Sequence, residues 1–544
     1  MSMSSAESSA VPPGSLGDLV RRGAAARPDA VALIDGRLRL TWTQLEQRMD
    51  TAATALAGLG LQPGDRLAVQ SATSADFVAV YLGALQAGVV VVPVNPAYTL
   101  AELAHILGDS GARVLITGSV AAVGQADELI AAHPALQRVV VAATSAPEPL
   151  QTVAQLLAAV PDGTPPPHVQ ASAGDLAVLL YTSGTSGRPK GAMLSVGALL
   201  ANLEQFAALT PTPVTDADRL FLPLPLFHVF GLNAGLGMAL YFRASVVLAA
   251  RFDVEASLAL MRDERVSVVI GVPVEFAAWA AHPDFGAGFA HVRFALSGSA
   301  PLSPDLVTTY GAAGVALFEG YGLTEAAPVI TTSLVPSAER PSGWQEPKPG
   351  SIGRPLPGVE VRLLDSDGEP VEPGDLGTLE VRGANLFTGY WPDATGGPAA
   401  DGWFATGDLA VADDDGDYYL VGRRSDLILV NGFNVYPAEV EAVLIRAPGV
   451  REVAVVGEPG PDGGDEVVAY VVPEPEVGFD PDELLDQAAG ALARFKLPRR
   501  VIEVDALPHT ATGKVMKWQL RRRERADGSG DARGAAEEAS GAAG

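Results

Sequence analysis

Short runs rich in Val and Leu alternate with helix-length patterns along the first half of the chain, and this alternation constrains the fold more than any other feature. We predict strands at Arg113–Thr117, Arg138–Ala142, Ala177–Tyr181, Ser245–Ala249, Ser267–Val272 and Val292–Leu296. Apolar strands separated by helices are typical of βαβ units, because helices cover a parallel sheet on both faces. The first half therefore predicts layered α/β subdomains.

The pattern changes from Gly353 to Tyr419. Strand-like runs at Val359–Leu364 and Gly377–Arg382 lie between turns rich in Pro, Gly and Asp. Turns at this spacing favour antiparallel pairing, so we expect a β-barrel-like subdomain here.

A third pattern begins near Arg423. A helix is expected over Tyr436–Ile445, with Pro437 suited to its first turn. The elements expected after it are strands at Val450–Gly457 and Glu466–Val472 and a helix at Pro481–Ala493. This part of the chain predicts a small α+β domain.

The length of 544 residues requires more than one domain, since single cores stop growing at roughly 250–300 residues. We expect a large N-terminal domain over residues 15–424 and a small C-terminal domain over residues 425–524. Residues 1–14 and 525–544 are rich in small and polar residues and are predicted to be disordered. The predicted fold class is a multidomain combination of α/β and α+β.

The chain is strongly acidic. Its 37 Lys and Arg against 64 Asp and Glu give a formal net charge of −27. Such a surface repels nucleic acid and anionic lipid, so neither is an expected partner. Solubility is the simpler explanation of the charge.

The chain contains no cysteine, which excludes disulfides, thiolate nucleophiles and Cys-ligated metals. Residues 1–14 lack the basic and apolar regions of a secretory signal. The longest apolar stretch, Val78–Val94, is interrupted by Gln86 and Gly88, which indicates a buried helix, a turn and a buried strand rather than a membrane span. We expect a cytoplasmic enzyme with no integral membrane segment.

A loop rich in Ser, Thr and Gly follows the predicted strand at Ala177–Tyr181. It reads Thr-Ser-Gly-Thr-Ser-Gly-Arg-Pro-Lys-Gly over residues 182–191. Glycine permits close backbone approach, backbone N–H groups can surround an oxyanion, and the lysine adds positive charge. The spacing is not that of a Walker A loop. Composition alone is compatible with a phosphate cradle or with a flexible surface loop.

The full string from Tyr181 to Gly191 resembles the phosphate-loop signature of the acyl-adenylate-forming, or AMP-binding, superfamily. Further segments resemble motifs of that family in the expected order: Pro225–Gly231, Gly298–Pro301, Gly320–Glu325, Trp403–Asp408, Gly422–Arg423 and Pro508–Lys514. The resemblance spans residues 15–520, and the strings look most like those of bacterial long-chain fatty acyl-CoA synthetases.

The resemblance implies two half-reactions. A carboxylic acid is first joined to the α-phosphate of ATP with release of pyrophosphate, and the acyl group then passes to the thiol of CoA. The implied substrates are a small carboxylic acid, ATP and CoA, and the implied cofactor is Mg²⁺. Because two anions meet in the first step, the site must fix positions and supply positive charge.

The resemblance also implies where ATP binds. The implied ATP-binding residues are Thr182, Ser183, Gly184, Thr185, Ser186, Gly187, Lys190, Gly298, Ser299, Ala300, Pro301, Glu319, Gly320, Tyr321, Gly322, Thr324, Asp408, Arg423 and Lys514. Tyr321 is expected to stack on adenine, with Gly298–Pro301 on the other face. Asp408 is expected to accept hydrogen bonds from both ribose hydroxyls, and Thr324 is expected to bind the α-phosphate.

The implied catalytic residues are Lys514, Thr324, Glu325 and His228. Lys514 is expected to bridge the α-phosphate and the carboxylate, where negative charge develops. Glu325 is the implied Mg²⁺ ligand, with Thr182 in the metal environment. His228 is either a wall and gate of the acyl and nucleotide pocket or a buried core histidine, since an ionised acid needs no base.

The second half-reaction requires the CoA thiol to reach the acyl-adenylate. In the family, the C-terminal domain rotates between the two steps and opens a pantetheine tunnel. The implied acyl and CoA contacts are Phe227, His228, Gly432 and Phe433. The hinge aligns with Ser425, where family members usually carry Asp or Lys, so Asp426 stays an alternative pivot.

The identity of the acid is less constrained. Pro225–Gly231 contains no carboxylate to pair with an ammonium group, which disfavours an amino acid. The resemblance implies a medium- or long-chain fatty acid, with an aryl acid as the alternative, and the apolar residues near this segment suit either an apolar pocket or a core. An acyl carrier protein is the alternative acceptor, and a homodimer is left open. Intact Lys514, Glu325 and Asp408 argue against a non-catalytic binder.

Overall fold

The computed structural model describes residues 14–183, 189–337, 343–430, 433–460, 465–475, 477–478, 480–510, 513–517 and 519–521. They divide into two compact units. The first unit runs to Val361 and includes residues 381–404, and the second comprises residues 362–380 and those from Ala405 onward. The domain boundary predicted after residue 424 lies inside the second unit and stays a prediction.

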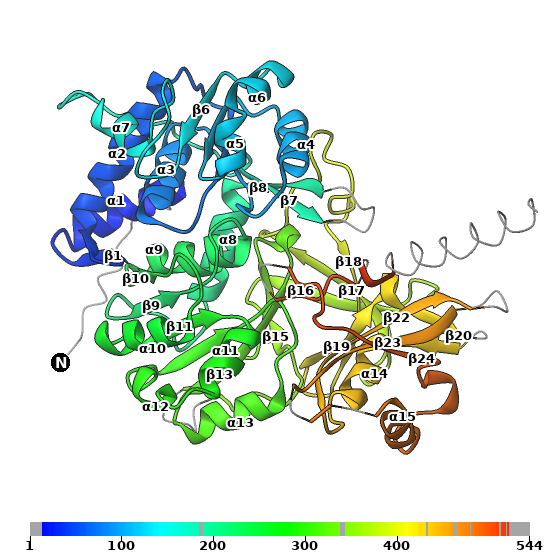
Figure 1. The fold of residues 1–544 in the computed structure, drawn as a ribbon. Coiled ribbons are helices and arrows are strands. Elements are labelled where there is room, and N and C mark those ends of the chain that lie inside the picture. The colour runs from blue at the N-terminus through cyan, green and yellow to red at the C-terminus, as the bar shows by residue number, and fades with distance from the viewer. Residues whose placement is uncertain are drawn as a thin grey trace, which may run out of the picture. The chain divides into compact units, whose positions relative to one another are not determined.

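A six-stranded sheet of order β6-β5-β3-β4-β7-β8 lies in the first unit (Figure 1). Its strands are β3 (Arg66–Gln70), β4 (Val90–Pro93), β5 (Val114–Thr117), β6 (Arg138–Val141), β7 (Leu176–Ser183) and β8 (Pro189–Ser195). The strands from β3 to β7 pair in parallel, which confirms that prediction, and β7 and β8 form an antiparallel hairpin.

Helices precede and connect these strands. They are α1 (Leu16–Ala26), α2 (Trp42–Gly58), α3 (Ala75–Gln86), α4 (Leu100–Ser110), α5 (Val120–Gly124), α6 (Ala126–Ala132) and α7 (Val153–Ala158). The stretch Val78–Val94 forms buried α3, a left-handed turn at Gly88 (φ 71°) and buried β4, as predicted. In the described parts of the chain, no helix has the length and apolar character needed to cross a membrane.

A nine-stranded sheet of order β15-β14-β13-β12-β11-β9-β10-β1-β2 completes the strands of the first unit. The strands are β1 (Val31–Asp35), β2 (Leu38–Thr41), β9 (Arg219–Leu222), β10 (Ser245–Leu248), β11 (Val268–Gly271), β12 (Phe294–Ser297), β13 (Ala316–Gly322), β14 (Val329–Thr332) and β15 (Arg354–Pro355). The series β1, β10, β9, β11, β12, β13 is parallel. The segments that leave β9, β12 and β13 therefore meet at one carboxyl edge, where ligands usually bind in such sheets.

The helices of this sheet are α8 (Val196–Ala207), α9 (Met238–Phe242), α10 (Val254–Asp263), α11 (Pro273–Ala280), α12 (Phe285–Gly288) and α13 (Pro304–Ala312). A π-helix, η1 (Phe230–Gly237), and a 3-10 turn, η2 (Thr324–Ala326), lie among them. An aromatic cluster around Trp279 packs the core, with Phe276, Phe289 and Tyr310 meeting edge to face.

The second unit contains most of a four-stranded sheet, a short hairpin and a three-stranded sheet. The strands are β16 (Val359–Leu364), β17 (Gly377–Gly383), β18 (Phe404–Ala412), β19 (Tyr418–Arg423), β20 (Ile428–Val430), β21 (Phe433–Val435), β22 (Val450–Pro459), β23 (Asp465–Pro473) and β24 (Arg500–Glu503). Its helices are α14 (Pro437–Leu444) and α15 (Pro481–Ala489), with 3-10 turns η3 (Arg424–Asp426) and η4 (Arg494–Lys496). The helix predicted over Pro481–Ala493 ends early, because Gly490 follows and disfavours helix.

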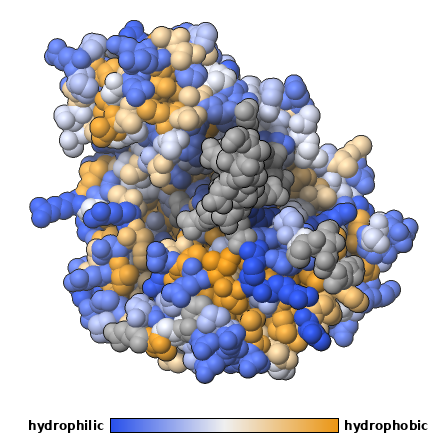
Figure 2. Space-filling view, turned by 45° about the vertical axis from the view of Figure 1, so that its right-hand side comes forward, coloured by the Kyte–Doolittle hydropathy of each residue, from blue (hydrophilic) through white to orange (hydrophobic). Residues whose placement is uncertain are grey.

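One face of the molecule carries both hydrophilic and apolar residues (Figure 2). Hydrophilic residues spread over the face in Figure 2, with apolar residues between them. The exposed large apolar side chains of the described residues are Leu38, Val120, Val274, Leu429, Phe433, Ile445 and Val477. They come from both units, and scattered apolar side chains of this kind are ordinary on a soluble surface.

Candidate active site

The predicted phosphate loop connects β7 and β8. Thr182 pairs with Lys190, and Tyr181 with Gly191, across this hairpin. Thr182 is half-buried and Lys190 is exposed. Outside the described residues lie Gly184, Thr185, Ser186 and Gly187, and of the Ser183 side chain nothing further is described. The hairpin thus holds both ends of the loop at one edge of the six-stranded sheet.

Helix α4 anchors this hairpin. The Tyr181 hydroxyl donates to the Asp109 carboxylate at 2.5 Å. Nε2 of His105 lies 3.1 Å from the Pro189 carbonyl oxygen. One contact precedes the phosphate loop and the other follows it, so a single helix fixes the distance that the loop must span.

The turn η2 carries Glu325. Its carboxylate Oε1 accepts a hydrogen bond from the Tyr390 hydroxyl, and its carbonyl accepts the Phe387 N–H at 2.8 Å. No further hydrogen bond or ion pair of this half-buried carboxylate is found among the described residues. A carboxylate with an available oxygen fits Mg²⁺, which takes one or two protein carboxylates together with phosphate oxygens. Within the described ranges no group of three or more His, Asp or Glu could hold a metal alone.

Buried amide side chains hold the same turn from outside. Nδ2 of Asn233 donates to the Ala327 carbonyl at 2.8 Å, and Nδ2 of Asn385 donates to the Ala326 carbonyl at 2.7 Å. The Asn202 side chain donates to the Val329 carbonyl and accepts a hydrogen bond from the Val329 N–H, two residues after Ala327. None of these three asparagines was predicted from the sequence. Their signal was a polar amide inside an apolar run, as at Asn233 between Leu232 and Ala234.

The turn at Gly298–Pro301, the third motif, lies beside the Gly320–Glu325 segment, since a Cβ on Gly298 would lie 3.2 Å from the Gly320 carbonyl oxygen. Ser297 and Glu319 are opposite each other in β12 and β13, and the Leu302 N–H donates to the Glu319 carboxyl at 3.3 Å. Burial raises the pKa of Glu319 to about 8, so this group is mostly protonated at pH 7. Ser299 has a left-handed backbone (φ 71°), a conformation often found at ligand sites.

At two glycines of these motifs, close packing leaves no room for a side chain. A Cβ on Gly298 would lie 2.9 Å from the Phe230 ring, which joins the second motif to the third. A Cβ on Gly322 would lie 1.9 Å from the Pro328 carbonyl oxygen. Tyr321, the predicted adenine-stacking residue, is buried beside them, and Gly320 and Thr324 are half-buried. The predicted nucleotide roles of these residues stay predictions.

His228 lies in the segment between β9 and η1. Its Nε2 is buried and has no hydrogen-bond partner within the described residues. Burial lowers the pKa of His228 to about 4, so the imidazole is neutral at pH 7. The Phe227 ring lies 4.9 Å from it, centroid to centroid. An unpartnered buried nitrogen suits the wall of a pocket, and the choice between gate and core histidine stays open.

The remaining predicted nucleotide residues lie in the second unit. Asp408 and Arg423 are opposite each other in β18 and β19, and Nε of Arg423 is 3.1 Å from Oδ1 of Asp408. The Lys514 loop is closed by its own residues: the Lys514 N–H donates to the side-chain Oγ1 of Thr510 at 3.1 Å, and the Thr510 N–H donates to the Lys514 carbonyl at 2.8 Å. The loop therefore forms a local hairpin.

Charges of the second unit surround Lys514. The side chain reaches solvent, yet protein atoms crowd its ammonium group. This desolvation is the main reason why the pKa of Lys514 is lowered, and Arg423 lowers it further, whereas Asp408 and Asp426 raise it. The predicted ribose-binding carboxylate and the predicted catalytic lysine thus share one electrostatic environment.

The predicted hinge and CoA contacts are also in this unit. Ser425 is exposed in η3, and its neighbour Asp426 forms an ion pair with Arg521 at 3.1 Å. Phe433 is exposed and stacks on Phe495 with ring centroids 4.8 Å apart. Gly432 lies outside the described residues.

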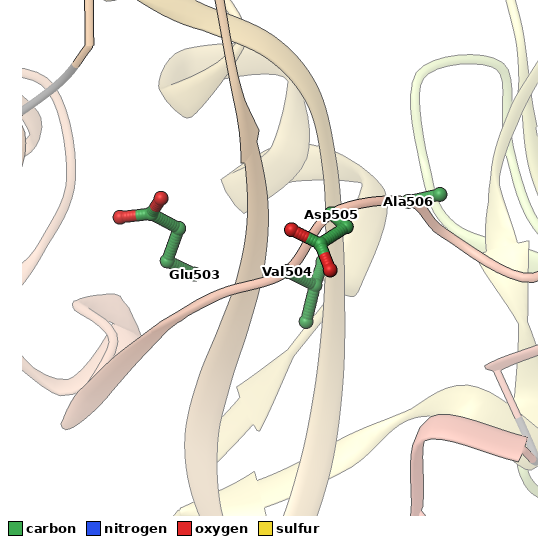
Figure 3. Close-up of a pocket in the computed structure, with 4 residues that line it drawn as sticks. All are labelled: Glu503, Val504, Asp505 and Ala506. Atoms are coloured by element: carbon green, nitrogen blue, oxygen red, sulfur yellow. The ribbon is translucent and has the colours of Figure 1, made fainter.

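A cavity of about 470 Å³ lies next to β24 (Figure 3). The described residues that line it include Glu503, Val504, Asp505 and Ala506. Its two carboxylates repel phosphate, and no predicted site residue lines it among the described parts of the chain.

Comparison with known proteins decides the family. The sequence pattern of AMP-binding enzymes matches residues 20–391, and that of the AMP-binding enzyme C-terminal domain matches residues 439–514. The chain belongs to the AMP-binding enzyme family. The predicted family and the predicted multidomain fold are thereby confirmed.

Relatives of this AMP-binding enzyme match along nearly their whole length. A feruloyl-CoA synthase from Amycolatopsis sp is 38% identical, over 93% of this chain and 99% of the relative. A long-chain-fatty-acid–CoA ligase from Yersinia pestis is 34% identical, over 95% and 96%. The crystal structure of ATP-bound MatB from Rhodopseudomonas palustris has a TM-score of 0.84 and 33% identity, over 93% and 98%.

The enzyme class follows from the family together with these relatives. It is an AMP-forming acid–CoA ligase, with ATP and CoA as substrates. The acid differs from one relative to the next, so the class is shared and the acid is not.

Proposed function

We propose that the chain activates an apolar carboxylic acid as its acyl-adenylate and then transfers the acyl group to CoA. The supporting observation is the neutral character of the region that joins the second and third motifs. Buried η1 follows His228, and its Phe230 ring packs against Gly298. His228 is unprotonated and Glu319 mostly protonated at pH 7, so neither of these two groups places a buried charge beside an apolar acyl tail.

A medium- or long-chain fatty acid and an aryl acid are the two candidate substrates. The first is supported by the apolar second motif and by the fatty-acid ligase at 34% identity. The second is supported by the feruloyl-CoA synthase at 38% identity. Both fit an apolar pocket, and they differ in the width and depth that the pocket needs.

The proposed roles follow the chemistry of each group. Lys514 bridges the α-phosphate and the carboxylate, while Asp408 accepts hydrogen bonds from the ribose. Glu325 and Thr182 hold Mg²⁺, which when bound offsets the charge of the phosphates. Rotation about Ser425 then withdraws the Lys514 loop and admits the CoA thiol.

A panel of acids tests the proposal. The purified full chain is incubated with ATP, Mg²⁺ and octanoate, palmitate, ferulate or phenylalanine, and pyrophosphate release is measured. Mass spectrometry then detects acyl-CoA when free CoA is the only acceptor. We expect both products with at least one apolar acid and neither with phenylalanine. Adenylate that accumulates without acyl-CoA would assign the chain to the loading of a carrier protein instead.

A further inference from the structure

Residues 387–391, which we call the tyrosine strap, run antiparallel to β8. The Thr388 N–H donates to the Met193 carbonyl, and the Met193 N–H donates to the Gly389 carbonyl, both at 3.0 Å. The Trp391 N–H donates to the Gly191 carbonyl at 2.8 Å. The strap therefore binds the strand that leaves the phosphate loop, although about two hundred residues separate them in the sequence.

The same strap reaches the predicted metal ligand. Its Phe387 N–H donates to the Glu325 carbonyl at 2.8 Å, and its Tyr390 hydroxyl donates to Oε1 of Glu325. Nζ of Lys190 lies 5.6 Å from the centre of the Tyr390 ring, within the range of a cation–π interaction. One side chain thus contacts both the lysine of the phosphate loop and the carboxylate of η2.

These contacts have consequences for a carboxylate that must bind a metal. A half-buried glutamate can rotate about its terminal bond, and ordering that rotation costs entropy each time an ion binds. A hydrogen bond from a neutral hydroxyl fixes one oxygen without cancelling the charge, so the other oxygen keeps a constant direction. The contact with the Tyr390 ring limits the positions of the Lys190 ammonium group in the same way.

We propose that Tyr390 is a positioning residue for Mg·ATP, which holds the Glu325 carboxylate and Lys190 at a fixed separation. The inference rests on the proposed function, since it takes Glu325 as the metal ligand and Lys190 as a phosphate contact. A purely structural tyrosine is the competing explanation, because the Tyr390 ring also packs on Phe387 at 5.1 Å.

Conservative variants separate the two explanations. Tyr390→Phe keeps the ring and its packing and removes only the hydroxyl. Tyr310→Phe is the matched control, since it removes a hydroxyl that donates to the buried Phe276 carbonyl at 3.0 Å, in the aromatic core of the same unit. Thermal unfolding of the full chain reports the stability of each variant.

Calorimetric binding of a non-hydrolysable ATP analogue to the full chain, repeated over a series of Mg²⁺ concentrations without acid or CoA, tests the positioning role. We expect Tyr390→Phe to weaken Mg²⁺-dependent binding about tenfold, the size of one hydrogen bond to a charged group. Glu325→Gln should weaken it at least as much, and adding Tyr390→Phe to it should have little further effect. Tyr310→Phe should bind as the wild type does.

Two results would overturn the inference alone. One is a Tyr390→Phe variant with the Mg²⁺ dependence of the wild type, whatever its unfolding temperature. The other is a double variant whose loss of binding free energy equals the sum of the two single losses, which would show that Tyr390 acts independently of Glu325. If the nucleotide affinity of the wild type did not depend on Mg²⁺, that result would instead refute the proposed metal site, and the role of Tyr390 with it.

Discussion

The Glu325 turn and the Lys514 loop each present one charged residue, but they are held in opposite ways. The turn is bonded by side chains from distant segments, including Asn233, Asn385 and Tyr390. The loop is closed by Thr510 and by a backbone bond from Met516 to Pro508 at 2.7 Å. A residue fixed by distant segments keeps its place only in the folded unit, whereas a local hairpin can move as a whole and keep its shape.

This difference suits the two roles proposed. A metal ligand serves every step that involves ATP, so a fixed turn is an advantage. The lysine serves adenylation and must then leave, so its loop must keep its form without contacts to the rest of the site. Substitutions in the two regions should therefore have different effects on activity and on stability.

The largest effect is expected for Lys514→Ala. Removing the cation at the developing charge should slow adenylation on the order of 10²–10³-fold. Thioester formation from supplied acyl-adenylate should be unaffected, as should the unfolding temperature, because the loop is closed without the lysine side chain. Pyrophosphate release and acyl-CoA formation are measured separately. Equal losses in both half-reactions would contradict the role.

The pH dependence sharpens this test. The pKa of Lys514 is lowered, so the lysine loses its proton at a lower pH than an ordinary lysine does. Adenylation should decline as pH rises through that pKa, since only the protonated form bridges the anions. Lys514→Arg should move the decline to higher pH, because arginine stays charged. If the decline of adenylation at high pH were the same in Lys514→Arg as in the wild type, another group would be the one that titrates.

Asn233→Ala tests the other region, the Glu325 turn, and should destabilise it. It removes the hydrogen bonds that Nδ2 of Asn233 donates to the buried carbonyls of Leu199 and Ala327, at a cost of about 2–4 kcal/mol of unfolding free energy. The urea midpoint of the first unit should fall, and Mg²⁺-dependent nucleotide binding should weaken with it. The matched variant Thr510→Val in the local loop should lose about 1 kcal/mol or less. Equal losses in both variants would remove the distinction.

The smallest effect concerns His228. Its pKa of about 4 lies below the ordinary value of 6.5, so the unfolded chain takes up this proton first. The stability from His228 is therefore present above pH 6.5 and is lost as pH falls toward 4, by about 1–2 kcal/mol at pH 5. His228→Gln should flatten this part of the urea-midpoint profile. An identical profile would mean that the histidine is solvated in the folded state.

Much of the architecture could be predicted from local patterns. The runs near residues 113, 138 and 245 became parallel strands, because continuous Val and Leu bury both faces of a sheet. The error at Pro481–Ala493 arose at a helix end, where a weak pattern continues beyond Gly490 although the helix does not. The motif residues were identified by resemblance, and the asparagines that hold the Glu325 turn were not, since a buried amide carries no local pattern.

The family, the enzyme class and the order of the motifs could be read from strings of neighbouring residues. The contacts of Tyr390 with both Glu325 and Lys190, and those by which Asn233 and Asn385 hold the turn, became known only from the folded chain. The physical reason is that such contacts depend on strand order and register, which bring together segments that are far apart along the chain. No local periodicity encodes which distant hydroxyl or amide will satisfy a given carboxylate or carbonyl.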